Sequence, residues 1–209
     1  CSELVVVTYQ REQEVVAWHR QVFGGAFGTG KAVCESVAVI PTEDSEYELY
    51  MIIKRTINGA TKRYVEYLNT FDFDQTDNTS FNFLDSQLNY SGATSTLNGD
   101  ISNSATTVTV ASGTDFTSSG KIKIDGEIIT YTGKSTNDLT GCTRGTESTT
   151  AAAHTSGATV KQVVNSLSGL NHLEGQEINI LADGSTHPNK TVASNAVTLD
   201  RFANSVKIG

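Results

Sequence analysis

Three Asx-Gly dipeptides, each placed next to runs of β-forming residues, constrain the fold of this chain more than any other feature. They are Asn58-Gly59, Asp125-Gly126 and Asp183-Gly184. Such pairs are typical of two-residue hairpin turns of type I′, whose central residues adopt positive φ. No segment shows an apolar period of 3.6 residues, which would indicate an amphipathic helix. The sequence therefore predicts an all-β fold of antiparallel hairpins.

A two-residue turn also fixes the register of the strands that it joins. The first of these turns predicts that Ile52 lies opposite Val65, a favourable apolar cross-strand pair. The second predicts that Ile122 lies opposite Ile129. These pairings can be compared directly with a structure.

The first hairpin brings four basic side chains together near its tip, on a chain whose net charge is −8. Its register places Lys54 opposite Arg63 and Arg55 opposite Lys62. Directly opposed like charges destabilise a strand pair, so something must offset them. Two interpretations stay open: flanking acids or solvent neutralise the bases, or the four residues dock onto an acidic partner or nucleic acid.

Residues 94–166 differ in composition from the chain on either side. The flanking segments, such as 47–55 and 175–181, are rich in large apolar and charged residues, whereas 94–166 is rich in Ser and Thr and has only Phe116 and Tyr131 as aromatics. Surface loops tolerate such insertions best. We therefore expect a small inserted β-module at 94–166, barrel-like or sandwich-like. The host domain is expected to comprise 1–93 plus 167–209 and to belong to a β-propeller or a β-sandwich platform.

The net charge, the hydropathy and the cysteine spacing each argue against a class of protein. The acidic balance makes the chain a poor general binder of nucleic acid, because phosphate contacts need Lys and Arg. No apolar run is long enough for a membrane-spanning helix, so we expect no membrane span. Cys1, Cys34 and Cys142 lack metal-site or redox spacing. We expect Cys34 and Cys142 to be small buried apolar residues in a reducing compartment.

The motifs that would indicate catalysis or cofactor binding are weak. The glycine-rich segment 23–30 is followed by Lys31-Ala32 and a strand, whereas a phosphate-binding loop needs Gly-Lys-Ser/Thr opening a helix. The four histidines have no partner at metal-ligand spacing. Asp72, Asp74 and Asp77 could bind Ca²⁺, but they lack the loop glycine and are better interpreted as a solvated loop. We expect no enzyme activity, no cofactor and no metal.

Several host segments, taken in order, resemble the tail tubular or nozzle proteins of short-tailed bacteriophages. The first is a T-Y-x-R-E-Q-E-V-x-A-W-x-R stretch at 8–20. The others are 35–41, 55–66, 83–90 and 167–175, the last of which leads into 181–184. The insert, through segments 128–133, 141–145 and 151–154, resembles a small β-module of phage structural proteins whose role is unsettled. The chain is shorter than a whole nozzle protein, so we expect it to be a fragment.

The resemblance implies a structural role rather than catalysis. Such a chain would be one subunit of a ring, with six as the expected number, in the virion tail after assembly in the bacterial cytoplasm. Its partners would be other copies, the portal adaptor or tail fibre proteins, and DNA would pass through the lumen only as cargo. An acidic lumen wall would repel DNA and let it slide.

Two alternatives belong to other classes. The insert could bind a glycan or receptor on the host surface, with Tyr131 and Phe116 as the only rings available for stacking on a sugar. A glycan hydrolase would use paired carboxylates, for which Asp72 with Asp74, or Glu174 with Glu177, are the candidates.

Overall fold

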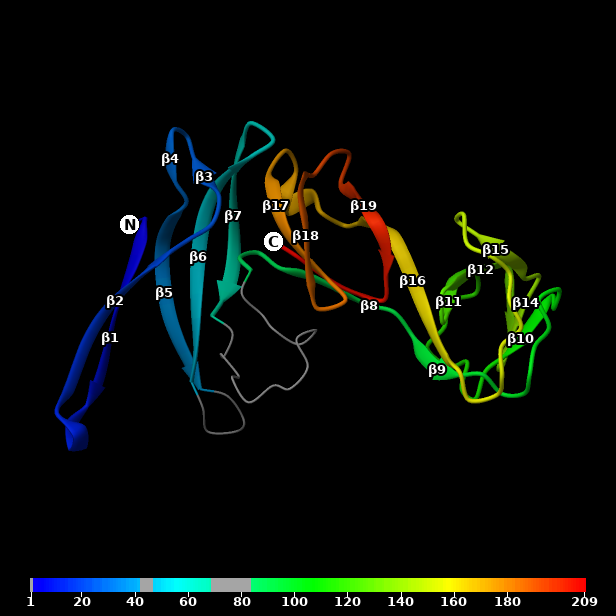
Figure 1. The fold of residues 1–209 in the computed structure, drawn as a ribbon. Helices are drawn as coiled ribbons and strands as arrows, with labels where there is room; N and C mark the ends of the chain where they lie inside the picture. The colour runs from blue at the N-terminus through cyan, green and yellow to red at the C-terminus, as the bar shows by residue number, and fades with distance from the viewer. Residues whose placement is uncertain (1, 42–46, 69–83) are drawn as a thin grey trace.

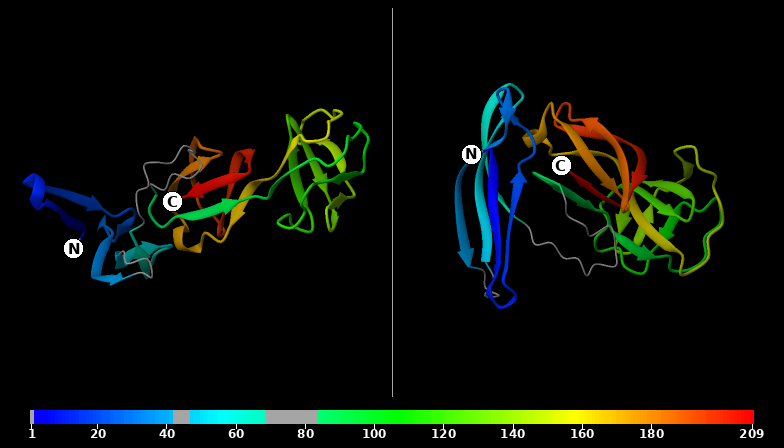
Figure 2. Two further views of the ribbon diagram at one scale, coloured as in Figure 1. Left: turned by 90° about the horizontal axis from the view of Figure 1, so that it is seen from below. Right: turned by 60° about the vertical axis from the view of Figure 1, so that its left-hand side comes forward.

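The computed structural model describes residues 2–41, 47–68 and 84–209, and it confirms the all-β prediction (Figure 1). Within these residues every sheet is antiparallel and none closes into a barrel. The only helical segments described are two single-turn 3₁₀ helices, η1 (Arg11–Gln13) and η3 (Asn171–Leu173). The candidate calcium ligands Asp72, Asp74 and Asp77 lie outside the described residues. Figure 2 shows an elongated molecule with the N-terminal hairpin at one end and the predicted insert at the other.

The chain begins with a two-stranded hairpin, which we call the arm. It consists of β1 (Glu3–Gln10) and β2 (Val15–Val22), joined through η1. Their pairing places Val7 opposite Trp18 and Tyr9 opposite Val16. A two-stranded sheet in isolation is marginally stable in water, so the arm depends on contacts with other elements.

A three-stranded sheet follows the arm. Its strands, in spatial order, are β5 (Val33–Pro41), β6 (Tyr47–Ile57) and β7 (Ala60–Tyr67), and a short hairpin of β3 (Ala26–Phe27) and β4 (Gly30–Lys31) precedes them. Asn58 and Gly59 have φ values of 48° and 72°, as a type I′ turn requires. The predicted register is confirmed, with Ile52 opposite Val65.

A second region of the host combines strands from both of its sequence segments. One sheet has the spatial order β18 (Ser185–Thr191), β17 (Glu177–Ala182), β20 (Ser205–Ile208) and β8 (Leu88–Ser91). The turn between β17 and β18 also adopts positive φ at Asp183 and Gly184. A further strand, β19 (Ala196–Ala203), packs its apolar residues into the same core.

Two sheets are built mainly from residues 94–166. The larger one orders β15 (Thr143–Thr146), β12 (Glu127–Tyr131), β11 (Gly120–Ile124) and β16 (Thr159–Ser168), and β9 (Thr94–Thr96) also pairs with β16. The smaller one orders β10 (Thr107–Thr109), β14 (Asp138–Thr140) and β13 (Gly133–Ser135). Ile122 lies opposite Ile129, as predicted from the second turn.

Strand β16 connects the insert to the host. Its first half pairs with β9 and β11, and its second half pairs with β19. Asn204 holds this junction, because its side-chain amide donates to the carbonyl oxygens of Gly92 at 2.9 Å and Gln162 at 2.8 Å. Gly92 and Gln162 lie near the two ends of the predicted insert. The side chain of Asn204, a host residue, therefore binds the chain close to both ends of the insert.

Buried apolar residues form three separate clusters. One spans Ala93 to Val160, almost wholly within the predicted insert, and includes Cys142. A second spans Leu167 to Ile208. The third spans Phe23 to Ile53 and includes Cys34. Burial of Cys34 and Cys142 confirms the sequence prediction. The residues that we assigned to one host domain thus contain two distinct cores.

Candidate assembly surface

The four basic residues of the first hairpin do not form a single patch. Lys54 and Arg63 lie on one face of the β5–β7 sheet, which we call the outer face. There both pair with Glu35, at 2.9 Å and 2.6 Å. Hydrogen bonds from Arg63 and then Lys54 lower the pKa of Glu35 to about 2. Glu35 reaches both bases because it is the extra residue of a β-bulge between Cys34 and Ser36.

Arg55 points to the opposite, inner face and is only 2% exposed. Its guanidinium forms a bidentate ion pair with Glu66, and its Nε donates to the carbonyl oxygen of Gly24 at 2.8 Å. Lys62, opposite Arg55 in the register, is exposed. Three of the four bases thus form ion pairs, with Lys54 and Arg63 sharing the single acid Glu35, and Arg55 is not available to a partner.

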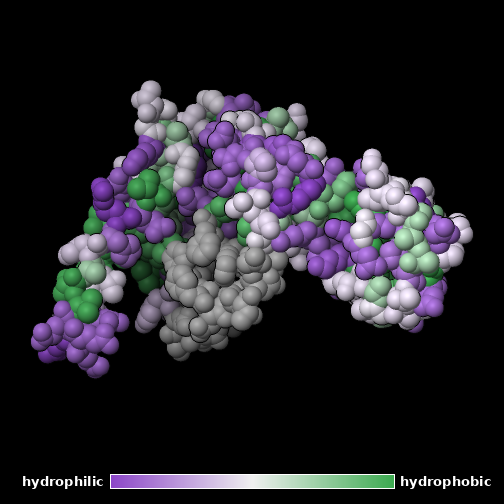
Figure 3. Space-filling model, viewed as in Figure 1, coloured by the Kyte–Doolittle hydropathy of each residue, from purple (hydrophilic) through white to green (hydrophobic). Residues whose placement is uncertain are grey.

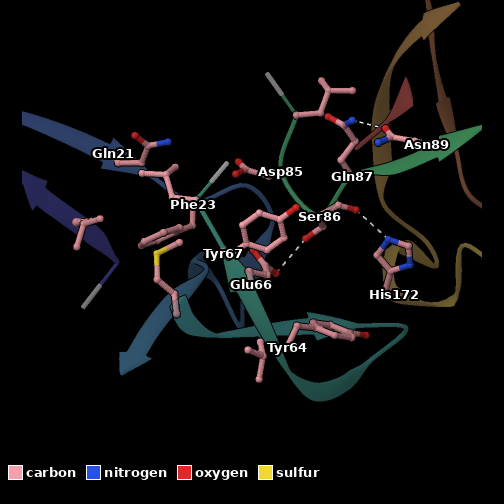
Figure 4. Close-up of a pocket in the computed structure, with 15 residues that line it drawn as sticks. Gln21, Phe23, Tyr64, Glu66, Tyr67, Asp85, Ser86, Gln87, Asn89 and His172 are labelled. Carbon is pink, nitrogen blue, oxygen red and sulfur yellow. Dashed lines mark hydrogen bonds between the residues drawn. The ribbon is translucent and has the colours of Figure 1, made fainter. Parts of the chain in front are cut away.

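A cavity of about 490 Å³ lies where the arm, the β5–β7 sheet and residues 84–87 meet (Figure 4). Its polar groups bond mainly to one another. The hydroxyl of Ser86 donates to Glu66 at 3.1 Å, and the Nε2 of His172 lies 2.9 Å from the carbonyl oxygen of Ser86. Asp85 accepts a hydrogen bond from the amide of Gly24 at 2.7 Å. These contacts tie the β5–β7 sheet to the second host region, so the cavity is better explained as a seam than as a ligand site.

The most unusual feature of the described surface is the apolar face of the arm. Val5, Val7, Tyr9, Val16 and Trp18 share one side of the hairpin by register, and all are exposed. Trp18 is 70% exposed. In Figure 3 hydrophobic patches lie along the arm at the lower left, next to a hydrophilic tip. Scattered exposed apolar residues are ordinary, but a contiguous group on one face marks an interaction surface.

The outer face of the β5–β7 sheet carries a second exposed apolar group. Ile52 and Val65 lie opposite each other, and Val65 is 72% exposed. In the next row that faces the same side, the rings of Tyr50 and Tyr67 lie 5.8 Å apart. Ile40, on β5, adds a further exposed side chain. The described residues therefore present one exposed apolar surface on the arm and another on the outer face. Val37 and Val39, on the inner side of β5, are also exposed.

The insert contains a buried ionic cluster that the sequence does not reveal. Glu127, 2% exposed, accepts hydrogen bonds from Arg144 and from the amides of Gly145 and Ala152. The ring of His154 lies between two carboxylates, with Nε2 2.8 Å from Glu127. Burial alone raises the pKa of Glu127. The hydrogen bonds from Arg144, Ala152, His154 and Gly145 outweigh it and lower this pKa to about 2. His154 is thus buried although it lies in 147–157, a segment made mostly of Ser, Thr and Ala.

Phe116 and Tyr131, the only aromatic residues of 94–166, are both in the core of the insert, 4% and 1% exposed. Neither ring can therefore stack on a sugar at the surface. Among residues 2–41, 47–68 and 84–209, no group of three or more His, Cys, Asp or Glu side chains could hold a metal ion. In the same residues, no helix has the length and apolar character needed to cross a membrane.

No protein-family model matches this chain, and no curated protein sequence does either.

Proposed function

We propose that this chain is a structural subunit of a self-assembling tail tube or nozzle of the kind that short-tailed bacteriophages build, without a catalytic role. The observation that carries this proposal is the pair of exposed apolar surfaces on the arm and on the outer face of the β5–β7 sheet. Leaving both in water is costly, since each square ångström of apolar area that is removed from water contributes roughly 25 cal/mol. An assembly that covers them recovers that free energy.

Two further observations support the proposal. Several segments of the host, taken in order, resemble tail tubular proteins, and one of those segments (8–20) lies within the arm. The polar groups around the cavity in Figure 4 are largely paired with one another, so that cavity offers little to a substrate. The partners proposed are other copies of the chain, together with the portal adaptor or tail fibre proteins. DNA crosses the assembly in the virion tail as cargo, and an acidic wall would favour its sliding.

Electron microscopy of the purified chain at high protein concentration tests this function. We expect ring-shaped particles of uniform diameter that enclose a central channel. Fields that contain only single chains, at concentrations where the protein stays in solution, would contradict it. Binding of a glycan by the insert has no supporting ring on the surface and is not proposed.

A further inference from the structure

We propose that the arm of one copy packs its apolar face onto the outer face of the β5–β7 sheet in the next copy. The contact joins two different surfaces, so it is heterologous. This inference rests on the proposed structural function and specifies the partner surface for each apolar face. Repetition of a heterologous contact generates a ring where the rotation closes.

The two apolar faces cannot meet within one chain. Leu4, on the side of the arm opposite Val5 and Val7, packs against the core cluster that contains Phe23 and Met51. Met51 lies on the inner face of the β5–β7 sheet, with Ile53 and Arg55. The arm is therefore held on the inner side of its own sheet. Bringing its exposed face to the outer side would dismantle that core, so any arm that packs on the outer face comes from another copy.

The two faces match in their spacing. On the arm, successive rows on the exposed side are Tyr9 with Val16 and then Val7 with Trp18. On the outer face, successive rows are Ile52 with Val65 and then Tyr50 with Tyr67. Neighbouring rows on one face are two residues apart, about 7 Å in each sheet. Two such rows can therefore stack in register, as the facing sheets of a β-sandwich do.

The charges at the ends of these rows set the orientation of the contact. Beyond Tyr9 and Val16, the tip of the arm carries Glu12 and Glu14 against a single base, Arg11, and all three are exposed. Beyond Ile52 and Val65, the outer face carries Lys54 and Arg63 against a single acid, Glu35. In this orientation the acidic tip of the arm lies over the basic end of the outer face.

The opposite ends of the two faces also carry charges of opposite sign. Arg20, which forms an ion pair with Glu3 at 3.3 Å, lies beyond Val7 and Trp18 on the exposed face of the arm, opposite Val5. Glu48 lies beyond Tyr50 on the outer face, opposite Ile40. The orientation that places the acidic tip over Lys54 and Arg63 therefore also places Arg20 near Glu48. The reversed orientation would bring like charges together at both ends, which is strongly unfavourable at an interface.

Complementation between two variants tests the contact. Trp18→Glu disables the arm and leaves the outer face intact, and Val65→Glu does the reverse. Both side chains are more than two-thirds exposed, so neither change removes core packing. We expect each variant alone to stay a single chain at concentrations where the unchanged protein assembles. An equimolar mixture should form a heterodimer that grows no further, because only one functional arm and one functional face remain.

The possible outcomes separate this inference from the proposed function. A mixture that stays monomeric, or single variants that assemble like the unchanged chain, would overturn the contact while leaving self-assembly in place. An unchanged chain that never associates would overturn both. A second pair checks the orientation: Glu12→Lys and Arg63→Glu should each weaken assembly, and the two changes on separate copies in one mixture should restore it. Weakening without restoration would refute the proposed orientation.

Discussion

Trp18 lies directly opposite Val7 in the β1–β2 pairing, and both side chains are exposed. Trp18 is the only tryptophan of the chain. Aromatic residues dominate the energetics of protein interfaces when a partner buries them. Trp18, the residue of the arm that could contribute most to an interface, is thus exposed to solvent in the single chain.

The emission of Trp18 should report the covering of the arm. We expect its fluorescence maximum to move to shorter wavelength as protein concentration rises, because the indole leaves water when a second copy covers it. The Val65→Glu variant is the matched control, since it retains Trp18 but loses the receiving face, and its emission should stay at long wavelength throughout. A maximum that is independent of concentration in the unchanged chain would argue that the arm stays uncovered.

Arg55 should be essential for stability and Lys62 should not, although they lie opposite each other in the hairpin. Arg55→Ala leaves Glu66 without its guanidinium partner and removes the donor to the carbonyl of Gly24. Removing one partner of a buried ion pair costs about 3–5 kcal/mol, whereas an exposed surface change stays within about 0.5 kcal/mol. Urea unfolding of both variants measures the difference. Equal losses in Arg55→Ala and Lys62→Ala would show that the Arg55–Glu66 pair contributes little.

The insert should lose stability in acid through Glu127. Its pKa is about 2 in the folded chain, against 4.5 for the unperturbed carboxyl. A depressed carboxyl pKa stabilises the fold above the unfolded value, and that contribution is lost as pH falls from about 4.5 towards 2. A shift of this size corresponds to roughly 3 kcal/mol.

The variant Glu127→Gln should unfold more easily at neutral pH and lose most of this acid dependence. Glu147→Gln is the control, because Glu147 forms a more exposed ion pair with Lys121 at 2.7 Å. Thermal unfolding measured between about pH 2 and 7 compares them. If Glu127→Gln keeps the full acid dependence of the unchanged chain, the carboxylate of Glu127 is not its source.

Two hairpin glycines should respond differently to alanine. Gly59 has a φ of 72°, which a residue with a Cβ adopts only with strain, and no neighbouring atom lies within 4 Å of the added carbon. The expected cost of Gly59→Ala is therefore one of backbone strain, about 1–2 kcal/mol. Gly126 also has open space around a Cβ but lies outside the left-handed region. Gly126→Ala should be close to neutral, and denaturant unfolding that gave equal losses would contradict this assignment.

Local rules in the sequence predicted the hairpins but not the surfaces that they expose. The turn at Asn58-Gly59 fixes the register because its geometry is set by its own two residues. The apolar run 4–7 predicts a strand. Whether that strand is buried depends on the element that packs against it, and the residues of the run do not specify that element. The sequence therefore could not show that Val5 and Trp18 are exposed.

The ion pairs could not be predicted from the sequence for a related reason. Glu35 meets Lys54 and Arg63 only because of a β-bulge, and a bulge shifts the facing of one residue without a clear sequence signal. Lys54 and Arg55, which we had grouped in one basic patch, are separated because consecutive residues of strand β6 face opposite sides of the sheet. In the insert, Glu127 and His154 meet although they are 27 residues apart in the sequence. Charged residues that pair over long separations become visible only when the strands are placed.

Multi-angle light scattering over a concentration series tests the central claim, that copies of this chain cover one another's apolar faces. The account predicts that the molar mass rises with concentration from that of a single chain to a defined multiple, and that Trp18→Glu stays at the single-chain mass. A mass that remains that of one chain across the whole series would contradict it.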